Sequence, residues 1–202
     1  MPSTLLFLPG ASGNTQFWRP VSQLLAHPAE KRHLGWPGFG VTPADPQVHG
    51  LKDLVASVVA AIQTPTALIA QSMGGVIAVL AALAKPQLIT HLVLSVTSDG
   101  MDMARFGAED WRPGFLAANP ALPDWFASDR QDLTRQLPGL KIPTLLLWGD
   151  ADPLSPVAVG QRLAALLPRA ELHVFPGGEH DLGHTRAREI APLIDRHLAR
   201  RA

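Results

Sequence analysis

Short apolar runs alternate with longer amphipathic stretches along most of the chain. The short runs have the length of strands, and most are rich in Leu, Ile and Val: 4–8, 31–35, 66–70, 91–96, 143–148 and 171–175. The longer stretches repeat their apolar residues with a helical period: 51–63, 73–84, 156–167 and 185–200. This alternation predicts an α/β fold, in which helices cover both faces of a mostly parallel sheet of about six strands.

The alternation breaks between Ser98 and Leu140. This segment contains irregularly spaced prolines and a group of aromatic residues: Phe106, Trp111, Phe115, Trp125 and Phe126. A structureless loop of this length is unusual in a compact domain, so we expect short helices within it. We interpret 98–140 as a short lid, inserted into a single domain that spans residues 1–202.

The composition narrows the class of protein. Hydrophobic residues make up 47% of the 202 residues, and 17 basic side chains balance 17 acidic ones. A formal net charge of zero gives no electrostatic attraction to nucleic acid or to an anionic membrane. The chain has no cysteine and its first residues do not resemble a secretion signal, so we expect a cytoplasmic protein. We interpret the longest apolar stretch, 67–84, as a strand, a sharp turn and a buried helix rather than a membrane span.

A serine stands where a predicted strand runs directly into a predicted helix. The segment Ala70-Gln71-Ser72-Met73-Gly74-Gly75 has small residues on both sides of Ser72. Such a turn is too tight for larger side chains, and it raises the serine hydroxyl above the sheet at a helix N-terminus. A serine that only caps a helix would give a similar pattern.

A serine nucleophile needs a base and an orienting carboxylate, and both can follow later strands. The strand 143–148 is followed by Gly149-Asp150-Ala151-Asp152-Pro153, and the strand 171–175 by a turn that contains His180. All these positions fall at the carboxyl ends of strands, where sites form in open α/β sheets. Asp152, Asp150 and Asp99 are the candidates for the acid.

A metal site is a weaker interpretation of the same region. His184 follows His180 at a spacing that suits two zinc ligands on one helix face, but no Glu follows His180 and no third ligand is evident. We therefore expect no metal and no cofactor. The other histidines have no motif around them, and we interpret them as packing or surface residues: His27, His33, His49, His91, His173 and His197.

Taken together, these segments resemble the α/β-hydrolase superfamily, in particular its small carboxylesterase-like serine hydrolases with a cap after the sixth family strand. The resemblance covers almost the whole chain and includes Leu8–Gly13 with Phe17-Trp18 nearby, Trp36–Gly40, the Ser72 turn, the Gly-Asp-x-Asp-Pro turn and the late histidine. The family pattern places the acid at the third residue after the glycine, which selects Asp152. The resemblance also implies an oxyanion hole formed by the backbone N–H groups of Ala11 and Met73.

The chain departs from the family pattern at several points. The family's first two strands are missing from the pattern, so we expect a trimmed version that begins at the third. Pro9-Gly10 stands where the family has His-Gly, which removes a side chain that helps hold the oxyanion loop. Glu179 replaces a small residue before His180, and we expect it to point to solvent.

The resemblance implies an ester-cleaving serine hydrolase that forms an acyl-enzyme on Ser72, with His180 as base and Asp152 orienting it. The substrate would be a small molecule with an acyl group. The candidates for its pocket are aromatic: Trp18, Trp111, Phe115, Trp125 and Phe126. The four of them in the lid could instead form only the lid's own small core. The same residues would serve an acyltransferase, a carbon–carbon bond hydrolase or a perhydrolase. A ligand-binding protein on a hydrolase scaffold is the alternative from another class.

Overall fold

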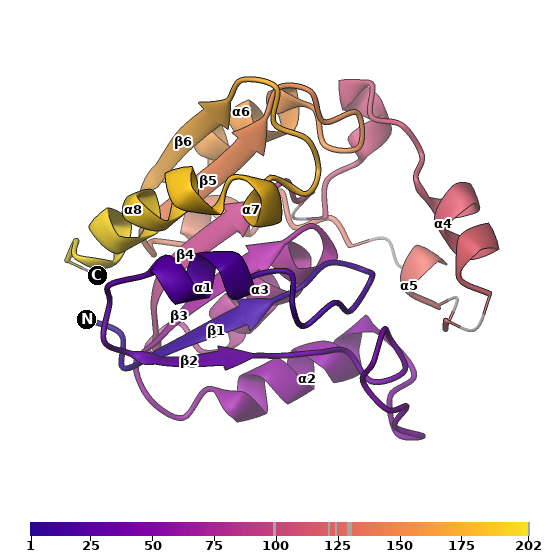
Figure 1. Cartoon of the computed structure of the whole chain (residues 1–202), viewed down its shortest axis with the longest axis horizontal. Coiled ribbons are helices and arrows are strands. Elements are labelled where there is room, and N and C mark those ends of the chain that lie inside the picture. Colours follow the sequence, from indigo (N-terminus) through magenta and orange to yellow (C-terminus); the bar gives the residue numbers. More distant parts are fainter. Residues whose placement is uncertain (99, 121, 124, 129–130, 202) are drawn as a thin grey trace.

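The chain is built around a parallel β-sheet, seen in the computed structural model of Figure 1. The structure describes residues 1–201 except 99, 121, 124 and 129–130, and of Phe126 it describes only the backbone. Within these residues the sheet has six strands in the order β2-β1-β3-β4-β5-β6, and every neighbouring pair is parallel. The strands are β1 (Thr4–Leu8), β2 (Glu30–His33), β3 (Thr66–Gln71), β4 (Ile89–Ser95), β5 (Thr144–Gly149) and β6 (Ala170–Phe175).

Helices cover both faces of this sheet (Figure 1). On one face α1 (Arg19–Leu24) and α8 (Ala187–Leu198) pack against each other, with the short α7 (Leu182–Thr185) beside them. On the other face lie α2 (Leu51–Ala61), α3 (Met73–Ala84) and α6 (Val157–Leu166). The middle strands β1, β3 and β5 are therefore buried along their whole length. Their continuous apolar runs are typical of parallel strands that are covered on both faces.

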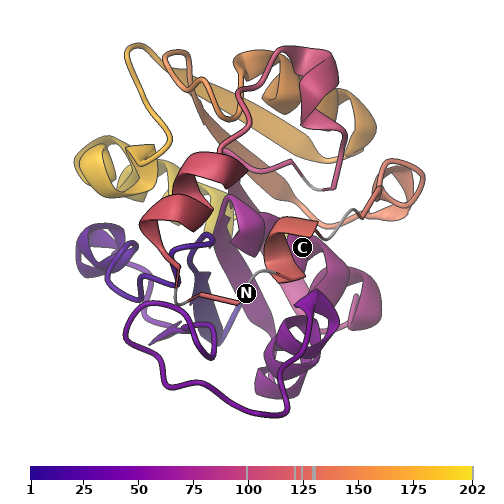
Figure 2. The ribbon, with the colours of Figure 1, turned by 90° about the vertical axis from the view of Figure 1, so that its right-hand side faces the viewer.

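The connection from β4 to β5, which we call the β4–β5 segment (residues 96–143), has short helices of its own. They are η1 (Met103–Phe106), α4 (Arg112–Ala118), α5 (Trp125–Ser128) and η2 (Leu137–Gly139). The helices α4 and α5 lie across the carboxyl ends of the strands (Figure 2). Arg112 Nε donates to the Ala127 carbonyl oxygen at 3.1 Å, which joins α4 to α5. The segment lies where a lid over this edge would lie, and its action as a lid remains a prediction.

The predicted α/β-hydrolase fold is confirmed, and the predicted bounds 4–8 and 73–84 agree with β1 and α3. The bounds 31–35 are wrong because Glu30 already pairs with Thr4, and the strand ends at His33. The predicted helix 185–200 is α8, which begins and ends two residues inside these bounds, and the short α7 before it was not predicted. The helix α1 was not predicted, since its 6 residues are too few to show a helical period.

The apolar stretch 67–84 is divided between a strand and a helix, as predicted. Among the helices that the described residues form, none has both the length and the apolar character needed to cross a membrane.

Two buried histidines contact each other where α8 packs on β4. His197 of α8 is 2% exposed, and its ring meets the ring of His91 in β4 edge to face at 5.1 Å. Burial, together with the nearby His91 and Arg200, lowers the pKa of His197 to about 4. Burial likewise lowers the pKa of His91. Both histidines are therefore neutral packing residues in the folded protein.

Buried neutral histidines make stability depend on pH. Because the folded pKa of His197 is about 4 and its ordinary value is 6.5, the unfolded chain binds the proton first as the pH falls. The free energy of unfolding should decrease between pH 6.5 and pH 4, with a His197 contribution on the order of 2 to 3 kcal/mol. Urea unfolding at several pH values should show a shallower decrease for His197→Gln than for wild type. Exposed His49→Gln is the control, and an unchanged slope in His197→Gln would contradict the assignment.

Gly160 tests the packing of α6 on the sheet. A Cβ at Gly160 would lie 2.7 Å from Cδ2 of the buried Trp148, whereas a Cβ at Gly114 of α4 would meet no atom within 4 Å. Gly160→Ala should therefore cost about 1–3 kcal/mol by overpacking. Gly114→Ala should be neutral or stabilising by up to about 1 kcal/mol, because alanine favours the helix. Urea denaturation measures both, and equal effects of the two substitutions would be inconsistent with this packing.

Candidate active site

Ser72 occupies a strained turn between β3 and α3. Its backbone has φ 52° and ψ −122°, a conformation that residues other than glycine rarely adopt. Two backbone hydrogen bonds hold it there: Ser72 N donates to the Ser95 carbonyl oxygen, and the Ser72 carbonyl oxygen accepts from Gly75 N, each at 2.9 Å. Such strain costs about 1–3 kcal/mol and concentrates at functional sites.

The two glycines after Ser72 let other chain segments approach the turn closely. A Cβ at Gly74 would overlap the Pro9 carbonyl oxygen, and one at Gly75 would overlap the side chain of Thr97. The small residues predicted here are required because a larger side chain would not fit. Their size lets the loop after β1 and the end of β4 lie against the start of α3.

His180 is hydrogen-bonded on both sides of its ring. Its Nδ1 lies 2.8 Å from Oδ2 of Asp152, and its Nε2 lies 3.1 Å from Oγ of Ser72. Because a carboxylate only accepts hydrogen bonds, the ring proton is on Nδ1 and Nε2 can accept from the Ser72 hydroxyl. Three residues from the ends of β3, β5 and β6 thus form one chain of hydrogen bonds.

The carboxylate of Asp152 is held in place by hydrogen bonds other than the one to His180. Its side chain is fully buried, and Oδ1 accepts from the backbone N–H groups of Leu154 at 2.8 Å and Ser155 at 3.2 Å. These local bonds are typical of an aspartate in a turn, and they leave Oδ2 for the imidazole. The indole N–H of Trp148 donates to the Ser155 carbonyl oxygen at 2.9 Å and closes the same loop.

The other two candidates for the acid are Asp150 and Asp99. Oδ1 of Asp150 accepts from Gly177 N at 2.7 Å, so Asp150 ties the turn after β5 to the turn after β6. The approach of these turns is close enough that a Cβ at Gly149 would overlap the backbone of Gly178. Asp150 is thus a turn residue that helps place His180. Asp99 lies outside the described residues.

The loop that carries Ala11 is held by a tryptophan that the sequence reasoning missed. Trp36 is buried, and its Nε1 donates to the carbonyl oxygens of Pro9 at 3.2 Å and Gly10 at 3.0 Å. A Cβ at Gly10 would lie 3.2 Å from Cβ of Ser72, so this loop runs directly beside the serine. Trp36 thus holds the loop that a histidine helps hold in the family pattern. The segment Trp36–Gly40 belongs to the resemblance, but nothing local in the sequence indicates this contact of the indole N–H.

Residues near His180 complete the site. Gln71, next to Ser72, donates from Nε2 to the His180 carbonyl oxygen at 3.3 Å, which links the turn after β3 to the turn after β6.

Glu179 is exposed, as predicted. His184 donates from Nδ1 to the Phe17 carbonyl oxygen at 3.0 Å. Among the described residues, no three His, Asp or Glu side chains come together in a way that could hold a metal ion.

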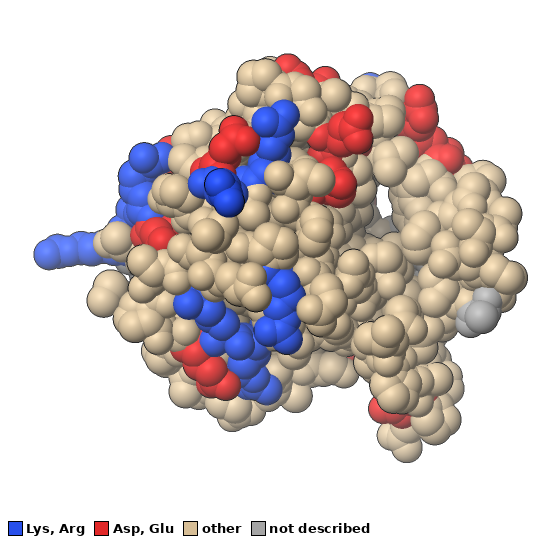
Figure 3. Space-filling model, in the orientation of Figure 1, with Lys and Arg blue, Asp and Glu red and all other residues tan. Residues whose placement is uncertain are grey.

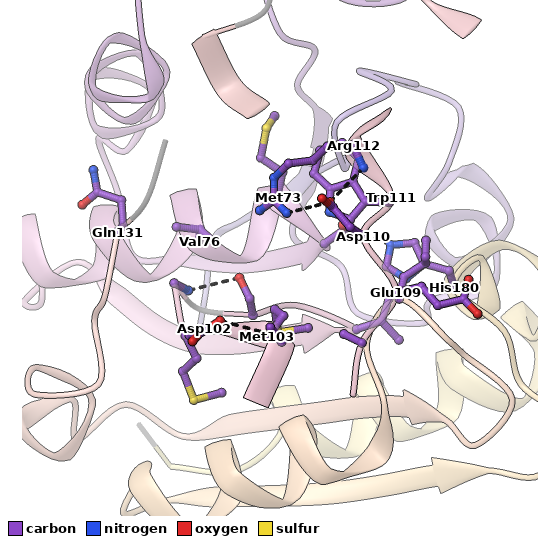
Figure 4. Close-up of a pocket in the computed structure, with 18 of the residues that line it drawn as sticks. Met73, Val76, Asp102, Met103, Glu109, Asp110, Trp111, Arg112, Gln131 and His180 are labelled. Atoms are coloured by element: carbon purple, nitrogen blue, oxygen red, sulfur yellow. Dashed lines mark hydrogen bonds and ion pairs between the residues drawn. The ribbon is translucent and has the colours of Figure 1, made fainter. Parts of the chain in front are cut away.

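A cavity of about 360 Å³ opens above Ser72 and His180 (Figure 4). The apolar part of its wall contains Leu51, Met73, Val76, Val96, Met101, Met103 and Trp111. The polar part contains Ser98, Asp102, Glu109, Asp110, Arg112 and Gln131. Most of this wall comes from the β4–β5 segment.

The structure places the aromatic candidates for the pocket in different parts of the molecule. Trp111 lines the cavity and packs edge to face on Phe115, while Trp125 packs edge to face on Phe39. Trp18 lies elsewhere: it is 1% exposed, and its Nε1 donates to the Leu8 carbonyl oxygen at 3.1 Å, so it supports β1 rather than the cavity. The side chain of Phe126 lies outside the described residues.

Comparison with curated proteins gives short matches. The chain is 45% identical over 56 residues to a poly(3-hydroxyalkanoate) depolymerase of Ectopseudomonas oleovorans, which covers 28% of this chain and 19% of that protein. It is 43% identical over 49 residues to a 2-hydroxy-6-oxo-6-phenylhexa-2,4-dienoate hydrolase of Delftia acidovorans, covering 24% and 17%. The matches to the first curated relatives span a quarter of their length or less.

Solved structures match over nearly the whole chain. An esterase of Thermogutta terrifontis superposes with a TM-score of 0.79 at 21% identity, covering 96% of this chain and 89% of that one. An esterase of Exiguobacterium antarcticum gives a TM-score of 0.76 at 16% identity, covering 97% and 92%. At such identities the likeness concerns the fold. The sequence pattern that defines the Alpha/beta hydrolase family matches residues 5–141, and a second pattern for the alpha/beta hydrolase fold matches 117–187. The chain therefore belongs to the alpha/beta hydrolase family.

Proposed function

We propose that this protein is a serine esterase that works through an acyl-enzyme on Ser72. The observation that carries the proposal is the continuous chain of hydrogen bonds from Ser72 Oγ to His180 and from His180 to Asp152, at 3.1 and 2.8 Å. Its two ends differ in exposure, because the Asp152 side chain is fully buried while Ser72 and His180 line the cavity. This is the arrangement that activates a serine hydroxyl.

In the first step His180 Nε2 takes the proton of the Ser72 hydroxyl while Oγ bonds to the ester carbonyl carbon. The carbonyl π electrons move onto the oxygen, which becomes an oxyanion. Asp152 holds the imidazole with its proton on Nδ1 and stabilises the imidazolium that forms. The two backbone N–H groups on Oδ1 keep the carboxylate in place during this step.

The oxyanion would be bound by the backbone N–H groups of Ala11 and Met73. Two observations support this assignment. Met73 is the first residue of α3, so its N–H belongs to a helix N-terminus, where negative charge is stabilised. Ala11 follows Gly10, whose backbone lies against Ser72 and is fixed by Trp36. Each such donor contributes about 3–4 kcal/mol to lowering the barrier.

The tetrahedral intermediate then re-forms its carbonyl and breaks the bond to the alkoxy oxygen. That oxygen takes the proton from His180 and leaves as an alcohol. A water molecule next gives a proton to His180 while its oxygen bonds to the acyl carbon. The second tetrahedral intermediate then re-forms its carbonyl and breaks the bond to Ser72 Oγ, which takes the proton back from His180, and a carboxylic acid leaves. No cofactor takes part in these steps.

The cavity suits a small or medium substrate, since its volume is about 360 Å³. The apolar wall around Met73, Val76 and Met101 would hold the acyl chain. An acyltransferase would use the same acyl-enzyme, with an alcohol in place of water. A carbon–carbon bond hydrolase or a perhydrolase would use the same three residues, and a ligand-binding protein would leave them unreactive. The experiments below separate the esterase from these alternatives.

Labelling and turnover should both depend on Ser72. A fluorophosphonate probe should label wild type on the peptide that contains Ser72, as read by mass spectrometry. Ser72→Ala and His180→Ala should abolish the label and lower kcat on p-nitrophenyl esters by about 10⁴-fold or more. Esters of increasing chain length should show a maximum at short or medium acyl groups. Folded protein that takes no label and turns over no ester would favour the ligand-binding alternative.

The two aspartates of the turn after β5 should differ sharply. Asp152→Asn removes the charge that fixes the imidazole tautomer, so kcat should fall by about 10⁴-fold. Asp150→Asn keeps an oxygen that can accept from Gly177 N, so its loss should stay below about tenfold. Steady-state kinetics on the best ester compares them. Similar losses in both variants would speak against Asp152 as the acid.

A further inference from the structure

We propose that the cavity selects esters with a neutral or cationic alcohol group over esters with an anionic one, and that Glu109 is the residue that makes this distinction. The inference rests on the proposed esterase function and names the substrate class of the same site. It follows from how the charged side chains of the cavity wall are paired.

The charged groups of the cavity wall are Asp102, Glu109, Asp110 and Arg112. Asp102 has a cation partner, because its Oδ2 lies 3.2 Å from Nε of Arg105, and its Oδ1 caps η1 by accepting from Ala104 N. Oδ1 of Asp110 lies 3.0 Å from Nη1 of Arg112. Each of these two carboxylates is thus balanced by a guanidinium.

The guanidinium of Arg112 is already engaged by groups of the protein. Its Nη1 is paired with Asp110, its Nε donates to the Ala127 carbonyl oxygen, and its guanidinium carbon lies 5.2 Å from the centre of the Trp111 ring. Within the described part of the chain, Arg112 is also the only Lys or Arg of the cavity wall.

Glu109 is different from the other acids of the wall. Its backbone N–H donates to the Pro153 carbonyl oxygen at 2.9 Å, so the chain at Glu109 is anchored to the residue after Asp152. Glu109 and His180 both line the cavity (Figure 4), and Asp152, the neighbour of Pro153, is bonded to His180 at 2.8 Å. Among the residues that the structure describes, no Lys, Arg or His lies within ion-pair distance of the Glu109 carboxylate. One negative charge without an ion-pair partner therefore lies on the cavity wall, on a segment anchored next to the Asp152–His180 pair.

The anchoring of Glu109 near the Asp152–His180 pair decides which part of the substrate meets this charge. His180 must lie within hydrogen-bond reach of the alcohol oxygen that it protonates, so the alcohol group of the ester is on the His180 side. A cation in that group would be attracted to Glu109, and an anion would be repelled. A neutral alcohol group would be indifferent to it.

The charges on the surface act in the same sense. The chain has no formal net charge, but Figure 3 shows acidic side chains near the hollow beside the β4–β5 segment and basic side chains gathered on the opposite side of the view. Charges of one sign around an opening raise the local concentration of oppositely charged ligands and lower that of like-charged ones. Anionic esters are therefore disfavoured before they reach Ser72.

The test compares three butyrate esters of similar shape that differ in the charge of the alcohol group. These are butyrylcholine, its uncharged analogue 3,3-dimethylbutyl butyrate, and 2-sulfoethyl butyrate. At low ionic strength wild type should show kcat/KM at least about tenfold higher for the cationic ester than for the anionic one, and the ratio should shrink with added salt. The ratio within each variant is the readout, so an overall loss of activity does not affect the comparison.

Two variants of Glu109 and one control make the test specific. Glu109→Gln should lower the cationic-to-anionic ratio by about three- to tenfold, and Glu109→Lys should lower it further or invert it. Glu179→Gln removes an exposed carboxylate next to His180 in sequence that does not line the cavity, and it should leave the ratio as in wild type.

Two results would overturn the proposal, and they differ in what they leave standing. Turnover of all three esters with a ratio near one, or with a ratio unchanged in both Glu109 variants, would overturn the role of Glu109 and leave the esterase function intact. No turnover of any ester, together with no fluorophosphonate label on Ser72, would overturn the esterase function and this inference with it.

Discussion

The site depends on backbone segments that approach one another more closely than would be possible if the residues in contact carried a Cβ. Gly10 lies against Ser72, Gly74 lies against the Pro9 carbonyl oxygen, and Gly149 lies against Gly178. A parallel sheet brings the ends of its strands to one edge, but hydrogen-bonding distance between Ser72, His180 and Asp152 requires these additional close approaches. Because the turns pack closely, three side chains that share one edge of the sheet also form one connected chain of hydrogen bonds.

Much of this arrangement could be predicted from the sequence because strong local patterns carried it. The apolar runs predicted the sheet, and the order of Ser72, Asp152 and His180 after successive strands predicted which side chains would meet. The hydrogen bonds of Asp150 and Asp152 separate their roles as the family pattern does. Weaker patterns predicted less: the bounds of β2, a short and polar edge strand, were wrong, and α1, too short for a period to show, was not predicted.

Other features could not be predicted because they depend on contacts between distant segments. Trp36 holds the loop of Pro9 and Gly10, and Gln71 bonds to the carbonyl of His180, but neither residue has a local signal for that role. Trp18 was a candidate for the pocket, yet its indole N–H donates to the carbonyl oxygen of Leu8 in β1 and it does not line the cavity. The charge pairing that isolates Glu109 likewise appears only when the β4–β5 segment is folded.

The central claim is that Ser72 carries the acyl group during turnover. The most direct measurement is rapid quenching of the protein mixed with excess p-nitrophenyl butyrate, followed by intact mass and peptide mapping. The account predicts a mass increase of one butyryl group, located on the peptide that contains Ser72 and formed as fast as the first equivalent of p-nitrophenol is released. Steady release of p-nitrophenol in a Ser72→Ala variant at the wild-type rate, or a butyryl group on another residue of the wild type, would contradict it.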